Sequence, residues 1–146
     1  TFWQLTVPSA SLKTFDAPER EFCTIRRSRT NTPLQALLLL NGTQYVEAAR
    51  KLRERMIREG GESIDDRITL GFRLVTARRP TAAELAIFRE AYEAELKHYT
   101  DDESAAEKLL SVGESPWDRQ LDKAELAAHA AVARLLLNLN EAITKG

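Results

Sequence analysis

The chain has 146 residues, of which 43% are hydrophobic and 29% charged, and its formal net charge at pH 7 is −1. This length suits one domain with its own core, and the composition is that of a globular protein. The longest apolar run, residues 36–40, is far shorter than the roughly 20 residues of a membrane-spanning helix, so we expect no membrane span. Residues 1–60 carry ten Lys and Arg against six Asp and Glu, whereas residues 61–146 carry eleven against sixteen. The acidic second half would oppose a long phosphate track, so we expect no nucleic acid among the partners.

Residues 1–31, here called the N-terminal segment, show no helical period of apolar residues. We expect this segment to lie extended over a helical body, with its aromatics as anchors. These aromatics are Phe2, Trp3, Phe15 and Phe22. Because the sequence starts inside this aromatic pattern and without an initiator Met, we expect it to be a fragment of a larger protein.

Cys23 is the only cysteine of the chain. A single cysteine excludes an internal disulfide, a cysteine-based zinc site and a c-type haem attachment motif. Its neighbours Phe22 and Ile25 are apolar, which predicts a small buried side chain.

From Thr32 onward, apolar residues recur at helical spacing. Thr32 and Pro33 predict an N-cap followed by proline at the first helical position. Thr81 and Glu84 have the form of a capping box, and Pro80 forbids the preceding helix to continue. The helices expected from these signals cover approximately residues 32–41, 43–59, 63–79, 81–101, 104–111 and 122–138.

The last expected helix, residues 122–138, is rich in Ala and Leu on nearly every side. A helix of this kind belongs in the middle of a bundle. No segment alternates between apolar and polar residues as a strand does. The sequence therefore predicts an all-α fold, an irregular bundle of five or six helices with an extended N-terminal segment. We expect a single domain over residues 1–146, with the bundle at 32–146.

The densest polar cluster directly precedes the first expected helix. Three arginines in front of a helix N-terminus could hold a carboxylate, phosphate or sulfate group. The same side chains could instead fix the N-terminal segment to the bundle by donating to backbone carbonyls. Both interpretations stay open here. The candidate ligand-binding residues are Asp16, Arg26, Arg27, Arg29, Asn31 and Gln35.

His98 and His129 are the only histidines. Glu95 and His98 have the i, i+3 spacing of a bundle metal site, but a di-metal site needs this motif twice. Glu125 and His129 share one helix face, a spacing that is common by chance. No Gly-rich phosphate loop or nucleophile elbow is present. We therefore expect no catalytic residue, no metal and no cofactor in this chain.

A set of short motifs runs along the whole chain. They comprise residues 1–3, 6–8, 14–18, 20–21, 23–24, 26–37, 39–41, 78–81 with Glu84, 112–116 and 135–139. Together they resemble the C-terminal domain of unknown function (DUF1553) in large planctomycete proteins that often also carry cytochrome-c-like modules. Residues 26–40 are the most specific part. The chain departs from the family pattern at His129, where a Trp is expected, and at Asn140 and Ala142, where an acidic and an aromatic residue are expected.

The resemblance implies a secreted or periplasmic parent with several domains, the haem lying elsewhere in it. It implies no catalytic residue. We expect a non-catalytic interaction or structural domain that docks onto neighbouring domains of the parent protein. The alternative is an enzymatic or ligand-binding module that acts with a neighbouring domain on a carbohydrate or an anionic ligand.

Overall fold

The structure, a computed structural model, describes residues 10–18, 23, 25–26, 30–113, 117 and 121–144. These residues form eight helices and no strand, which confirms the all-α fold. The helices are α1 (Ala10–Thr14), α2 (Pro33–Asn41), α3 (Thr43–Glu59), α4 (Ile64–Thr76), α5 (Ala82–Asp101), α6 (Glu103–Leu110), α7 (Lys123–Leu137) and α8 (Asn140–Ile143). The two beyond the expected six are α1 and α8, which are too short to show an apolar period. That the chain is one domain of a larger protein stays a prediction.

Local capping signals set most helix boundaries. Thr81 and Glu84 form the expected capping box at the start of α5. By contrast, α4 ends at Thr76, earlier than expected, because Ala77 adopts a left-handed backbone with φ of 63°. A residue in that conformation commonly closes a helix. Among the described residues, no helix combines the length and the apolar character needed to cross a membrane.

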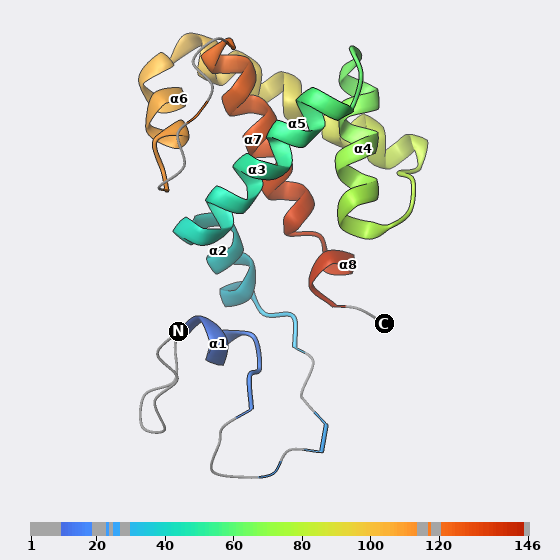
Figure 1. Ribbon diagram of the computed structural model, residues 1–146, viewed down its shortest axis with the longest axis vertical. Helices are drawn as coiled ribbons and strands as arrows, with labels where there is room; N and C mark the ends of the chain where they lie inside the picture. Colours follow the sequence, from blue (N-terminus) through green and yellow to red (C-terminus); the bar gives the residue numbers. More distant parts are fainter. Residues whose placement is uncertain are drawn as a thin grey trace.

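Helix α7 runs through the middle of the bundle and packs against α2, α3, α4, α5, α6 and α8 (Figure 1). Ten of its 15 residues are buried, which confirms the expected central helix. Six of the ten are alanines, so neighbouring helices meet α7 across short side chains. They are Ala124, Ala127, Ala128, Ala130, Ala131 and Ala133.

Two groups of buried side chains surround α7. The larger group fills the space between α3, α4, α5 and α7 and includes Met56, Phe72, Phe88, Val132 and Leu136. The smaller group lies where α5, α6 and α7 meet and includes Tyr99, Ala106 and Ala127. Both groups border α7, and the partly buried Leu96 of α5 packs against each of them.

The N-terminal segment differs from the expected extended strap at residues 10–14, which form α1 beside the start of α2. Phe15 serves as the expected aromatic anchor, because its ring packs edge-on against Tyr45 with centroids 6.0 Å apart. The other three predicted anchors, Phe2, Trp3 and Phe22, lie outside the described residues.

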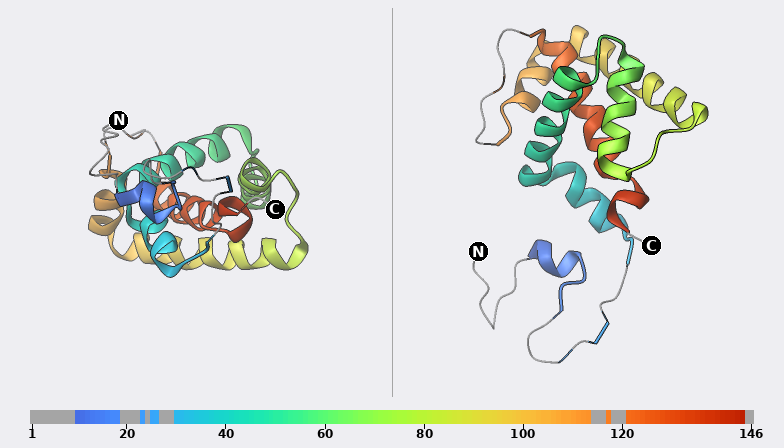
Figure 2. Two further views of the ribbon diagram at one scale, coloured as in Figure 1. Left: turned by 90° about the horizontal axis from the view of Figure 1, so that it is seen from below. Right: turned by 45° about the vertical axis from the view of Figure 1, so that its right-hand side comes forward.

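The prediction that Cys23 is buried is wrong. Cys23 is exposed, and the side chain of Ile25 is fully exposed at 104%. This part of the segment lies outside the helical body (Figure 2), so no packed surface covers either side chain.

Two arginines of α3 are buried in the bundle. Arg50 is 1% exposed and donates to the carbonyl of Val112. Arg53 is 0% exposed and lies 3.7 Å from the carboxylate of Glu54. Gly113, directly after Val112, has φ of +93°, which favours glycine. The turn that follows α6 is thus fixed onto α3.

His129 is fully buried on α7. Its Nδ1 lies 2.9 Å from the carbonyl of Glu125, and its ring packs edge-on against Tyr92 at 4.7 Å. A carbonyl only accepts, so Nδ1 carries the proton, and Nε2 has no hydrogen-bond partner among the described residues. Burial lowers the pKa of His129, and the nearby guanidiniums of Arg67 and Arg53 lower it further. The folded domain therefore holds His129 neutral.

We expect the domain to lose stability on mild acidification. The folded-state pKa of His129 lies below the ordinary value of 6.5, so the unfolded chain takes up this proton more readily than the folded domain as the pH falls. The free energy of unfolding should begin to fall as the pH approaches 6.5 and should decline further towards pH 5.5, by less than about 1.4 kcal/mol per pH unit. Urea denaturation followed by circular dichroism at a series of pH values measures this slope.

The two histidines supply matched variants for this experiment. His129→Gln should remove the slope between pH 6.5 and 5.5, whereas His98→Gln, changed at an exposed position of α5, should retain it. An undiminished slope in His129→Gln would contradict the assignment.

Candidate functional site

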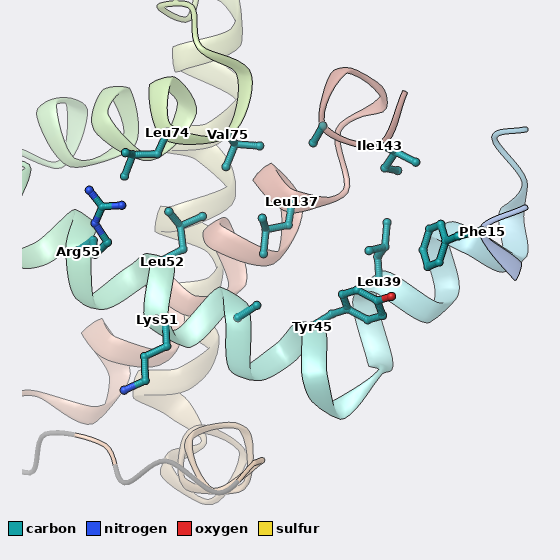
Figure 3. A pocket seen from close by; sticks show the side chains of 12 residues that line it. Phe15, Leu39, Tyr45, Lys51, Leu52, Arg55, Leu74, Val75, Leu137 and Ile143 are labelled. Atoms are coloured by element: carbon teal, nitrogen blue, oxygen red, sulfur yellow. The ribbon is translucent and has the colours of Figure 1, made fainter. Parts of the chain in front are cut away.

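An open groove of about 700 Å³ crosses one side of the bundle (Figure 3). Its walls come from α3, α4 and α8, with contributions from α2, α7 and the N-terminal segment. The lining residues are Phe15, Leu39, Tyr45, Ala48, Lys51, Leu52, Arg55, Leu74, Val75, Leu137, Ala142 and Ile143. Most of these side chains are apolar, and Leu74 is still 38% exposed, so the groove offers an apolar surface to solvent.

Both walls of the groove follow from local sequence. On α3, Tyr45, Ala48, Leu52 and Arg55 are spaced by three or four residues, so they lie on one helix face. The opposite wall includes α8, whose four residues include none that is buried. A helix this short cannot hold its place by apolar burial alone.

Arg78 supplies the attachment that α8 lacks. Its guanidinium forms two hydrogen bonds to Glu84, at 3.0 and 2.6 Å, and two to Glu141 of α8, at 3.0 and 2.9 Å. It also lies 4.8 Å from the ring centre of Phe72. One planar cation thus ties the turn between α4 and α5 to α8.

The electrostatics of this junction favour the fully charged form. Hydrogen bonds from Arg78 and Thr81 lower the pKa of Glu84 to about 2, and both carboxylates raise the pKa of Arg78. Arg78 and Glu84 are therefore ionised at neutral pH, and the hydrogen bonds of Arg78 keep α8 in position beside the groove.

The two cations of the groove both stand on α3. The ammonium of Lys51 lies 3.1 Å from Glu54, and the guanidinium of Arg55 is held by Glu59 at 3.0 Å. The side chains of Lys51 and Arg55 are 53% and 52% exposed. Among the described lining residues none is acidic, and the carboxylates that pair with the two cations stand beside the groove on α3.

This lining suits the binding of an apolar surface. Apart from Tyr45, Lys51 and Arg55, the described lining residues carry no polar side chain. No three His, Cys, Asp or Glu side chains in the described parts of the chain are placed to hold a metal ion. The groove is thus an exposed apolar surface with two cations at its border.

The sequence-predicted ligand residues lie elsewhere, at the attachment of the N-terminal segment to α2. The carboxylate of Asp16 accepts from the backbone N–H and the hydroxyl of Thr30, at 2.9 and 2.6 Å. Asn31 donates to Asn140 at 2.6 Å. Arg26 is exposed, and Arg27 and Arg29 lie outside the described residues. Ligand binding by this cluster stays a prediction.

Gln35 is the most buried described member of that cluster, at 1% exposed. Its Nε2 donates to the carbonyl of Thr14 at 2.7 Å and to the hydroxyl of Thr30 at 2.9 Å. Its Oε1 accepts from the backbone N–H of Thr32, and the hydroxyl of Thr32 accepts from the backbone N–H of Gln35, which completes a capping box. One amide therefore closes the start of α2 and holds the N-terminal segment.

Sequence reasoning missed the groove. The apolar spacing predicts a helix over residues 43–59, but nothing in a periodic pattern tells a covered helix face from an open one.

We expect Gln35→Leu to destabilise α2 and the attached segment. The change leaves the N–H of Thr32 and the carbonyl of Thr14 without their partner, at a cost of about 1–3 kcal/mol. Chemical denaturation should show the loss, and amide hydrogen exchange should speed up at Thr30 and Thr32. The exposed Gln44→Leu, on the first turn of α3, is the matched control and should leave both measurements unchanged.

Comparison with known proteins gives one match. Neither the curated proteins nor the solved structures include a match to this chain. Residues 1–92 match the family PSD1, described as a protein of unknown function (DUF1553). The matched part covers the N-terminal segment, the Thr32–Gln35 capping box, α3 with Lys51 and Arg55, and α4. The chain belongs to the PSD1 (DUF1553) family.

Proposed function

We propose that this chain is a non-catalytic interaction domain of a multi-domain extracytoplasmic protein and that it docks onto a neighbouring domain through the groove. The observation that carries the proposal is the open apolar groove of about 700 Å³ between α3, α4 and α8. Contiguous apolar surface of this kind marks interaction sites in proteins that otherwise cover their apolar side chains. The secreted or periplasmic location and the cytochrome-c-like neighbours belong to the same proposal and rest on the family resemblance.

The attachment of the groove walls supports a docking role. Arg78 fixes α8 through Glu84 and Glu141, and Gln35 fixes the segment that carries Phe15. Both walls are therefore held before a partner arrives. A surface held in this way loses little conformational freedom on binding.

Site-specific labelling in the full-length parent protein tests this proposal. Ala48 lies in the groove and Ala86 lies on α5, and both are exposed helical positions with a basic residue three places later, Lys51 and Arg89. Each is changed to Cys in a Cys23→Ser background, and maleimide labelling is located by peptide mass spectrometry.

We expect the two cysteines to react at similar rates in the isolated chain. In the parent protein, labelling at Ala48→Cys should slow by at least about tenfold, because docking within one chain has a high effective concentration, while Ala86→Cys should keep its rate. Equal labelling of Ala48→Cys in both proteins would show that the groove is open in the parent, and the proposal would fail.

A further inference from the structure

The shape of the groove matches a rod. Tyr45, Ala48, Leu52 and Arg55 lie within eleven residues of α3, over about 15 Å of helix. Figure 3 shows the lining side chains strung out from Arg55 and Leu74 at one end to Phe15 at the other. A sheltered small-molecule site would instead enclose its ligand and aim several polar groups at it. An elongated, open, apolar groove fits the apolar face of a helix.

The polar groups that line the groove all belong to α3, which forms one of its walls. The hydroxyl of Tyr45, the ammonium of Lys51 and the guanidinium of Arg55 belong to α3. The residues from α4 and α8 that line the opposite side are apolar, and they are Leu74, Val75, Ala142 and Ile143. A partner that binds in the groove therefore meets an apolar surface with Lys51 and Arg55 along one side, here called the cationic edge.

The cations of this edge keep donors for a partner. Arg55 uses Nε and Nη2 on Glu59, two of its five N–H donors, and Lys51 has three ammonium protons for the carboxylate of Glu54. Exposed ion pairs within one helix contribute little to stability. A further carboxylate can thus bind each cation without displacing its present partner.

From this asymmetry we propose that the occupant of the groove is an amphipathic helix from a neighbouring domain of the same parent protein, with Asp or Glu side chains along the edge that faces α3. Lys51 and Arg55 are four residues apart, so two carboxylates one helical turn apart on the occupant meet them in register. The inference rests on the proposed docking function and adds the chemistry of the partner.

Zero-length cross-linking of the full-length parent protein tests the inference directly. A carbodiimide joins an ammonium group to a carboxylate only when the two are in contact, and peptide mass spectrometry identifies both residues. We expect Lys51 to be joined to an Asp or Glu of another domain, within a stretch whose apolar residues recur at i, i+3, i+4 and i+7. Lys97, exposed on α5, should form no such link to that stretch, and Lys51→Arg should abolish the link while keeping the charge.

Charge reversal provides a second readout. Lys51→Glu combined with Arg55→Glu should restore fast labelling of Ala48→Cys in the parent, whereas Lys97→Glu should leave Ala48→Cys protected. If Lys51 links only to Glu54, or to a stretch without a helical apolar period, the acidic helix is wrong. Protection of Ala48→Cys that survives the charge reversal contradicts the acidic edge but leaves docking intact, and absence of any protection overturns docking itself.

Discussion

The buried alanines of α7 allow the other helices to approach it closely, and the arrangement of the bundle depends on this close approach. Where a helix presents only methyl groups, its neighbours pack against it at short distance. Gly71 of α4 shows how little space remains, because a Cβ placed there would lie 3.0 Å from Leu136 and 2.7 Å from the sulfur of Met56. Alanine on α7 and glycine on α4 thus allow α4 to reach the core.

The periphery of the bundle is held in a different way. Arg134 of α7 donates to the carbonyl of Leu40 at the end of α2, and Arg78 fixes α8 through two carboxylates. Gln35 attaches the N-terminal segment. Each of these polar contacts fixes the position of one short element through a single side chain, without covering apolar surface. The short elements are held in place while the groove between them remains open.

The sequence predicted the parts of the fold that depend on local chemistry. The capping residues Thr32 and Thr81 located two helix starts, and the uniformly apolar stretch at 122–138 identified the central helix. It did not predict α1 and α8, because five and four residues are too few to display a period. The groove could not be predicted from the sequence either. It lies between helices whose relative placement depends on contacts distant in sequence. Gln35 was named as a ligand residue, but the partners it has in the structure are backbone and side-chain groups of this chain.

The groove and the core share side chains, and this couples docking to stability. Leu52, Val75 and Leu137 line the groove and also pack against the buried group around Phe72. A helix that covers them removes apolar surface from water on the outer side of the same residues that the core holds on the inner side. Ligands that bind only the folded state stabilise it in proportion to the logarithm of their concentration over Kd. Under the docking proposed above, an attached neighbouring domain acts at a high effective concentration, so this domain should be more stable within its parent than alone. Lys51 and Arg55 at the border of the groove would then select the helix that provides this stability.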